Sequence, residues 1–274
     1  MLIAHLSDTH ITEPGRKACG VANTNAAVAR CVARINGLHP RPDLALVTGD
    51  ITNDGTLMQM REAARILAAL DMPFRVVPGN HDDRAALLEA FAPEHCAEAE
   101  TGHVQFTFDH ADVRFIALDS SHPGTPGGVF GEDRARWLEA ALEAARGRRV
   151  IILLHHPPLK FGVLETDADG FEGAERLAEL VRAHGNVERV LCGHIHLDAH
   201  AGWAGTVVST APAASGMRLA LDLTMTEEPA FVLDDGAFLL HQRTADGGLA
   251  THCLRARADA PRHPFHSERG LSND

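Results

Sequence analysis

Long apolar runs and export signals are both missing from this sequence of 274 residues. No stretch approaches the roughly 18 consecutive apolar residues that a membrane-spanning helix needs. At the N-terminus, His5 and Asp8 interrupt the apolar stretch, and no basic residue precedes it, so the pattern of a secretory signal is absent. We therefore expect a cytoplasmic protein with no membrane partner.

Paired cysteines are missing as well. The cysteines are odd in number and no two are spaced as Cys-x-x-Cys; they are Cys19, Cys31, Cys96, Cys192 and Cys253. This usage is typical of reduced thiols, and it excludes a disulfide framework or a thiolate zinc site as the basis of the fold.

Positive charge is scarce: the chain has 25 Lys and Arg residues against 37 Asp and Glu residues, which gives a net charge of −12. A surface of this sign repels nucleic-acid backbones and anionic membranes. We therefore expect a small-molecule substrate and no nucleic acid polymer as partner. An anionic substrate would need a local positive centre, which a bound metal would supply.

What the sequence does contain is an ordinary globular composition, with 45% hydrophobic residues. Apolar runs alternate with amphipathic patterns through the first 200 residues, and residues 44–47 and 150–154 are continuously apolar, as in strands buried on both faces. The alternation predicts a layered α/β domain. The predicted strands are 2–7, 44–48, 74–77, 106–108, 113–118, 150–154 and 190–192, and the predicted helices are 25–36, 56–70, 84–91, 133–146 and 174–184.

The pattern changes after His196. Turn residues now separate short strand candidates, at 206–210, 218–223, 230–233, 238–243 and 249–254. We accordingly divide the chain into a core over residues 1–200, a β-rich part over 201–257 and a polar tail over 258–274, which we predict to be poorly ordered.

Residues of types that commonly bind metals follow five of the predicted strands. The five motifs are Asp8-x-His10, Gly49-Asp50, Gly79-Asn80-His81-Asp82, His155-His156-Pro157-Pro158 and Gly193-His194-x-His196. Ligands bind at the carboxyl ends of strands in an open α/β sheet. Each motif alone has an ordinary explanation, as a chance pair, a turn or a polar loop. Their joint occurrence at five strand ends favours a metal site.

The number of candidate ligands predicts two metals. The candidates are Asp8, His10, Asp50, Asn80, His156, His194 and His196. Seven ligands are too many for one tetrahedral zinc with an open position. Two ions about 3.5–4 Å apart would share one carboxylate. Oxygen and imidazole donors without thiolates suit Mn, Fe, Co or Zn.

The ordered set of motifs over residues 1–200 resembles the calcineurin-like metallophosphoesterase superfamily. Finer features are similar to bacterial class III cyclic-nucleotide phosphodiesterases and to glycerophosphodiester phosphodiesterases; they include residues 5–10, Asp119-Ser120-Ser121, 155–159 and Ser209-Thr210-x-Pro212. The resemblance implies a four-layer α/β/β/α sandwich in which residues 1–200 form the catalytic core. It implies that the part over 201–257 completes the sandwich and caps the site or forms a homo-oligomer contact.

The resemblance also implies the role of each site residue. Asp8, His10 and His196 would hold one metal, while Asn80, His156 and His194 would hold the other, with Asp50 bridging them. His155 would be structural or would support a ligand. His81 would be the catalytic residue, as a hydrogen-bond donor or general acid, and Asn80 and His81 would contact the substrate phosphate.

The activity that the resemblance implies is hydrolysis of small phosphodiesters by a metal-bound hydroxide. Cyclic AMP and glycerophosphodiesters are both candidate substrates, and Gly216 gives cyclic AMP a slight preference, because some relatives that cleave glycerophosphodiesters carry a histidine near that position. Relatives with a purple ferric site have tyrosine where this chain has Asn53, and the chain has no tyrosine, so a tyrosinate–iron site is excluded. The alternatives are a phosphomonoesterase, a phosphoprotein phosphatase and a metal-binding scaffold without catalysis.

Overall fold

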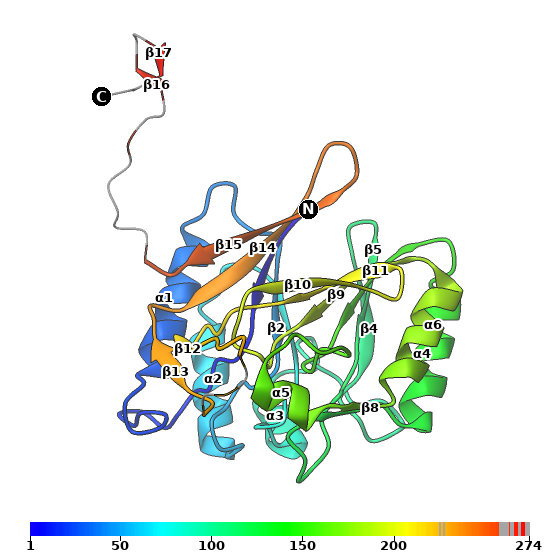
Figure 1. Ribbon diagram of the computed structural model, residues 1–274, viewed down its shortest axis with the longest axis horizontal. Helices are drawn as coiled ribbons and strands as arrows, with labels where there is room; N and C mark the ends of the chain where they lie inside the picture. The colour runs from blue at the N-terminus through cyan, green and yellow to red at the C-terminus, as the bar shows by residue number, and fades with distance from the viewer. Residues whose placement is uncertain (225, 227, 258–262, 264–265, 268–269, 272–274) are drawn as a thin grey trace.

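The structure is a computed structural model that describes residues 1–224, 226, 228–257, 263, 266–267 and 270–271. Two large sheets form its centre (Figure 1), with strand orders β15-β14-β1-β2-β3 and β10-β11-β9-β7-β5-β4. The elements follow the chain in the order β1 (Leu2–Leu6), α1 (Thr24–Asn36), β2 (Leu44–Thr48), α2 (Leu57–Leu67), β3 (Phe74–Val77), α3 (Arg84–Ala90), β4 (Phe106–His110), β5 (Val113–Ala117), β6 (Gly128–Val129), α4 (Glu132–Ala144), β7 (Arg149–Leu153), α5 (Leu164–Asp169), β8 (Phe171–Glu172), α6 (Ala174–His184), β9 (Val187–Cys192), β10 (Ala199–Trp203), β11 (Thr206–Thr210), β12 (Met217–Leu219), β13 (Phe231–Leu233), β14 (Ala237–Arg243), β15 (Leu249–Arg255), β16 (His266–Ser267) and β17 (Gly270–Leu271).

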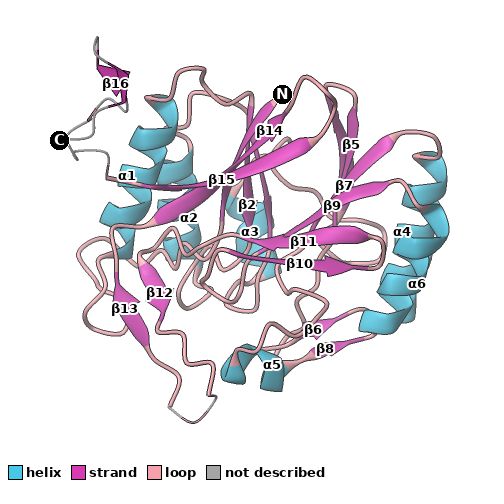
Figure 2. Ribbon diagram, turned by 45° about the horizontal axis from the view of Figure 1, so that its top comes forward, coloured by secondary structure: helices cyan, strands magenta, loops and turns pink. Residues whose placement is uncertain are grey.

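The two sheets pack face to face between two layers of helices. Leu44 and Leu46 of β2 share a buried cluster with Phe115 of the opposite sheet, while the alternate residues of β2 pack with α1 and α2. On the far side, α4 and α6 share a third cluster with β7 and β9. Figure 2 shows the two pairs of helices on opposite sides of the strands. The fold is therefore the four-layer α/β/β/α sandwich that the resemblance implied.

The parallel strands place the predicted site at one edge. Strands β1, β2 and β3 are parallel neighbours in one sheet, and β5, β7, β9 and β11 are parallel neighbours in the other. Their carboxyl ends carry the loops with the five motifs. The buried, continuously apolar strands thus position the polar loops that follow them.

The segment after residue 200 contributes to both sheets. Strand β14 pairs antiparallel with β1, β15 pairs with β14, and β11 pairs parallel with β9. Strands β12 and β13 form a separate two-stranded sheet. The division at residue 200 stays a prediction, and most of the predicted tail over 258–274 lies outside the described residues. Among the described residues, no helix is both long and apolar enough to cross a bilayer.

Helix α2 shows where a local prediction is right in part. The helix lies within the predicted range 56–70, and Thr56 caps it, since its Oγ1 accepts from the backbone N–H of Gln59 at 3.3 Å. The Gln59 side chain, however, bonds to both the backbone N–H and the carboxylate of Asp54, at 2.8 and 2.7 Å, instead of closing a capping box with Thr56. The helix ends at Leu67, three residues before the predicted end.

Candidate metal centre

The loops after β1, β2 and β9 bring four candidate ligands together. The ligand atoms of Asp8, His10, Asp50 and His196 all lie within 4.8 Å of one another. His10 Nε2 lies 3.8 Å from Asp50 Oδ2, and His196 Nε2 lies 3.5 Å from Asp8 Oδ1. Residues separated by nearly 190 positions in the sequence thus form one group of imidazoles and carboxylates, the donor set of a divalent transition metal.

A second group lies beside the first. The ligand nitrogens of His155, His156 and His194 also lie within 4.8 Å of one another, and His156 Nε2 is 3.2 Å from Asn80 Oδ1. His155 Nε2 lies 3.3 Å from Asp50 Oδ2. Asp50 therefore contacts both groups, which is the position that a bridging carboxylate needs.

The backbone at the site is strained. Among the described residues, eight other than glycine have positive φ, and five of them are candidate ligands: Asp8 (φ 52°), His10 (41°), Asp50 (47°), His194 (74°) and His196 (54°). The left-handed region costs such residues about 1–3 kcal/mol each. Strain concentrated on one set of polar residues indicates that their placement serves function rather than stability.

Two glycines allow the loops to approach this closely. A Cβ atom on Gly193 would lie 1.8 Å from Ser7 Oγ and 2.7 Å from Asp8 Oδ2. A Cβ atom on Gly79 would lie 2.2 Å from Asp50 Oδ1. Any side chain at these positions would displace the two candidate carboxylate ligands, so the glycines of the motifs are required by packing at the site.

Several nitrogens at the site are suited to metal binding. His196 Nδ1 donates to the backbone carbonyl of Met217 at 2.6 Å, so its Nε2 carries the lone pair. That Nε2 lies 3.0 Å from Nε2 of His10, an approach that requires a proton or a cation between the two nitrogens. His155 Nε2 and His194 Nε2 are buried without a hydrogen-bond partner among the described residues. Buried imidazole nitrogens without a hydrogen-bond partner fit a metal as ligands.

The electrostatics of the site also favour a cation. Burial lowers the pKa of His194 to about 3 and holds the pKa values of His10 and His156 well below the ordinary range. Burial by itself would also lower the pKa of His155, but the Asp50 carboxylate beside it raises that pKa to about 9. A proton held between these two side chains is a positive charge that a metal would displace on binding.

The adjacent residues His155 and His156 lie in two different environments. His155 Nδ1 donates to the backbone carbonyl of Thr48 at 2.7 Å, so its Nε2, which faces Asp50, is the nitrogen that holds the proton a metal would displace. His156 Nε2 lies 3.0 Å from the backbone carbonyl of Pro126, which only accepts, so this nitrogen carries the hydrogen. His156 Nδ1 then accepts from Ser120 Oγ at 2.9 Å. Both nitrogens of His156 are engaged, whereas His155 Nε2 has no hydrogen-bond partner among the described residues.

His81 lies at the mouth of the site and is exposed. Its Nδ1 donates to the backbone carbonyl of Asn53 at 2.7 Å, and its ring meets the His10 ring edge-on, with centroids 4.8 Å apart. Its backbone N–H donates to Asp50 Oδ1 at 3.0 Å. The side chain is therefore fixed beside both groups of ligands, and its Nε2 is left for another partner.

Two carboxylates outside the candidate ligand set, the partly buried Asp82 and the fully buried Asp119, hold the site loops. Asp82 accepts from the backbone N–H groups of Gly79, Ile51 and Thr52, at 2.9, 3.0 and 2.9 Å. Asp119 receives Arg84 Nε at 2.6 Å. Asp82 closes the motif that begins at Gly79, so its place in the sequence was the available signal for its role.

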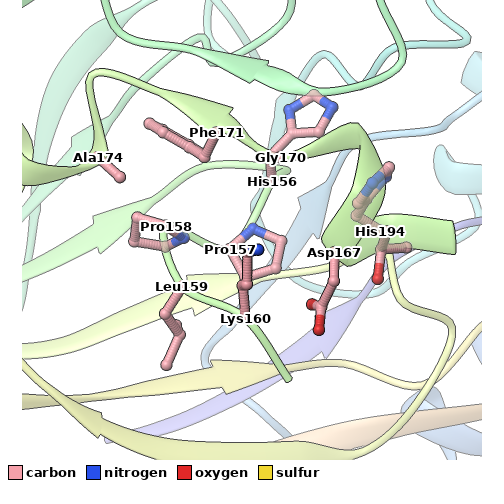
Figure 3. A pocket seen from close by; sticks show the side chains of 11 residues that line it. His156, Pro157, Pro158, Leu159, Lys160, Asp167, Gly170, Phe171, Ala174 and His194 are labelled. Atoms are coloured by element: carbon pink, nitrogen blue, oxygen red, sulfur yellow. The ribbon is translucent and has the colours of Figure 1, made fainter. Parts of the chain in front are cut away.

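A cavity of about 360 Å³ opens onto the candidate metal ligands. His10, Asp50, Asn80, His81, His194 and His196 line it together with Asp169 of α5 and with Met217, Leu219 and Phe231 of the β12–β13 hairpin. A smaller pocket of about 250 Å³ lies beside it and shares His194 and Thr166 with it. Figure 3 shows the smaller pocket, walled by Pro157, Pro158, Leu159 and Phe171, with Lys160 at its side.

Comparisons with known proteins identify the family to which the chain belongs. The sequence model of the calcineurin-like phosphoesterase family matches residues 1–198. A probable glycerophosphodiester phosphodiesterase from Arcobacter nitrofigilis is 35% identical over 271 residues, which is 98% of either chain. A 3',5'-cyclic adenosine monophosphate phosphodiesterase from Pseudomonas aeruginosa is 31% identical over 197 residues, covering 72% of this chain and 70% of that protein.

Solved structures show the same fold at lower identity. A dimetal phosphatase from Danio rerio aligns with a TM-score of 0.60 and 16% identity, covering 94% of this chain and 99% of that one. A Plasmodium protein described as the anchor in the inner membrane complex aligns with a TM-score of 0.64 and 16% identity, covering 94% of this chain and 85% of that one. At this identity the likeness concerns the fold alone.

Proposed function

Because this chain belongs to the calcineurin-like phosphoesterase family, and because it is a phosphodiesterase of that family, we propose that it cleaves glycerophosphodiesters. The observation that carries this proposal is similarity over 98% of the chain to a probable glycerophosphodiester phosphodiesterase. Similarity to the cyclic AMP phosphodiesterase covers 72%. The candidate metal centre makes the scaffold alternative unattractive, because the chain retains the residues that the chemistry requires.

Gly216 does not argue for cyclic AMP once its backbone is considered. The residue has φ +79°, and a Cβ atom there would lie 2.3 Å from the backbone oxygen of Asp234. The turn before the β12–β13 hairpin therefore requires glycine at this position in any case. Its identity carries no information about the substrate, and the slight preference for cyclic AMP loses its basis.

The charge of the cavity supports a diester over a monoester. Among the described residues that line it, there is neither lysine nor arginine. Arg84, which follows the Asn80–Asp82 motif, is bound to Asp119 and to the backbone carbonyl of Ser121. Two metals would balance the single negative charge of a diester, whereas a monoester dianion would benefit from further cations.

We propose two sets of ligands for the metals. Asp8, His10 and His196 would hold one, and Asn80, His155 and His194 the other, with Asp50 shared. His155 replaces His156 in this proposal, because His155 Nε2 has no hydrogen-bond partner among the described residues, whereas both nitrogens of His156 have one. Mn, Fe, Co or Zn would suit these donors. When bound, the two ions supply positive charge to the phosphate and lower the pKa of water.

The side chains around the metals would orient the substrate and move a proton. The alkoxide that leaves phosphorus is a poor leaving group unless it is protonated. We propose that the imidazolium form of His81 supplies this proton from Nε2 and becomes the neutral ring, while the hydrogen bond from Nδ1 to Asn53 keeps the ring beside the cavity. The Asn80 amide would contact the phosphate from the same loop.

A substrate panel with and without metal tests this function. Purified protein would be treated with a chelator, reloaded with Mn²⁺, Co²⁺ or Zn²⁺, and assayed with glycerophosphoethanolamine, cyclic AMP and glycerol 3-phosphate. We expect activity only after reloading, and the highest kcat/KM with the glycerophosphodiester. A higher kcat/KM for cyclic AMP would favour the second candidate function. Full activity in protein shown by elemental analysis to be metal-free would overturn the metal centre.

His81→Ala is expected to retain both metals and to lose turnover. General acid–base assistance is typically about 10²–10⁴-fold, so kcat for an alkyl diester should fall by that factor. The loss should be smaller for an activated aryl diester, whose leaving group needs less protonation. His122→Ala removes an exposed imidazole outside the cavity lining and serves as the control. An unchanged kcat with the alkyl diester would remove the proposed role of His81.

We further propose a homo-oligomer that involves the hairpin segment. Leu221, Leu223 and Leu233 are exposed by 50%, 75% and 58%, while Met217, Leu219 and Phe231 of the same segment line the cavity. The segment would therefore cap the site with one side and bury the other in a contact.

The five cysteines are unpaired thiols, which supports a location in the cytoplasm.

A further inference from the structure

Asp169 is a carboxylate on the cavity wall that the proposed metal chemistry does not use. It is the last residue of α5, a short helix that lies beside β6 and β8, apart from the two helical layers (Figure 2). Its side chain is 22% exposed, and its Oδ2 lies 3.9 Å from Nε2 of His194. Among the described residues, no lysine or arginine lies within ion-pair distance of it.

The rest of the cavity leaves this charge uncompensated. Asp50 is the other carboxylate in the lining, and it lies between the two groups of candidate ligands. Lys160 lines the neighbouring pocket rather than the metal cavity (Figure 3). The other polar lining residues carry no fixed charge. Asp169 is thus the place in the cavity where a positive group from outside would find a partner.

The apolar part of the cavity lining also suits an alkylated cation. Met217, Leu219, Ala230 and Phe231 line the same cavity. Apolar side chains would pack against the carbon atoms around a substituted ammonium, and an aromatic ring attracts its charge. A primary hydroxyl or a carboxylate would gain neither contact.

We propose that Asp169 determines specificity by binding a cationic group on one ester arm of the substrate. The inference rests on the proposed function and narrows it to glycerophosphodiesters of amino alcohols. The metals would hold the phosphate, while Asp169 pairs with the ammonium of the alcohol. Charge complementarity of this kind selects among substrates that the metals alone treat alike.

A rival role for Asp169 is to act on the metal position itself, because its Oδ2 faces His194 Nε2, the unpartnered nitrogen that fits a metal. Carboxylates close to metal-binding imidazoles commonly tune the metal. The two roles predict different results. A residue that acts on the metal position affects metal affinity and every substrate equally, whereas a specificity-determining residue affects the cationic substrate alone.

The test compares two esters that differ only in charge. Glycerophosphocholine and its 3,3-dimethylbutyl analogue have the same shape, but a carbon replaces the quaternary nitrogen in the analogue. We expect the metal-loaded wild type to prefer the cationic ester by roughly fivefold in kcat/KM, the effect of a partly exposed ion pair. Asp169→Asn should abolish the preference with the rate for the neutral ester unchanged, and added salt should weaken it in the wild type.

Binding provides a readout that does not depend on turnover. Calorimetry with phosphocholine and 3,3-dimethylbutyl phosphate should show the same preference in wild type and its loss in Asp169→Asn. Asp112→Asn, which removes an exposed carboxylate in the turn between β4 and β5, is the matched control. Absence of a preference in the wild type, in rates and in binding, overturns the proposal. An equal loss for both esters with reduced metal content assigns Asp169 to the metal position instead. If neither diester is cleaved, the proposed function fails, and the binding comparison still decides the role of Asp169.

Discussion

Asp50→Ala is expected to empty both metal positions together and to lower kcat/KM for a glycerophosphodiester by at least about a thousandfold. The carboxylate lies 3.8 Å from His10 Nε2 in one group of ligands and 3.3 Å from His155 Nε2 in the other. Both ions would lose a ligand, and metal ions contribute several kcal/mol of transition-state stabilisation, at 1.36 kcal/mol per tenfold. Asn80→Ala should mainly weaken one ion, because a neutral amide oxygen serves a single cation.

Elemental analysis and metal titration by calorimetry measure this difference. Asp50 also accepts a hydrogen bond from the backbone of His81, so Asp50→Asn is included to keep the size of the side chain while removing its charge. Circular dichroism would show that each variant is folded, and Asp112→Asn again reports the effect of a carboxylate far from the site. Equal, small losses of metal in the Asp50 and Asn80 variants would contradict the bridging role.

The sequence predicted the candidate metal centre because short apolar strands are followed directly by polar motifs. Asp8 follows β1, Asp50 follows β2 and His194 follows β9, and strands that are parallel neighbours must deliver such residues to one edge. The pairing of β14 with β1 could not be derived in the same way. Antiparallel addition of a late strand depends on the open edge of the sheet, which leaves no mark on the local pattern.

Short elements escaped prediction for a physical reason. Helix α5 has only six residues, and β6 and β8 have two each, so no hydrophobic period develops within them. Strand β10 carries His200 and Gly202 and lies at the edge of its sheet, where apolar alternation is not required. Asp169 belongs to such an element, and its place in the cavity emerges only from the fold.

The resemblance implies His156 as the ligand, and our proposal of His155 in its place rests on contacts that the sequence does not show. The two residues are adjacent, both precede prolines, and both are fully buried. Backbone carbonyls from distant segments distinguish them, since Thr48 receives the hydrogen of His155 Nδ1 and Pro126 receives that of His156 Nε2. A tautomer fixed by a long-range contact has no signature in the local sequence.

His155→Ala is therefore expected to lose far more metal than His156→Ala. Removing a ligand should lower the affinity of one ion by more than about 100-fold, whereas removing a group that supports the site typically costs about 10–100-fold. His155→Ala should also leave the buried Asp50 carboxylate without its imidazole neighbour, which adds to the damage. Activity at limiting metal should follow the same order.

Calorimetric titration with Mn²⁺ or Zn²⁺ on the two variants measures the difference directly. The variants are well matched, because each deletes one buried imidazole from neighbouring positions. His155→Gln and His156→Gln restore part of the lost volume and show whether a cavity, rather than a missing ligand, is responsible. Excess metal should rescue His156→Ala at a lower concentration than His155→Ala, because only the second variant lacks a donor atom beside Asp50. If His156→Ala loses the metal and His155→Ala keeps it, the proposed tautomers are wrong and His156 is the ligand.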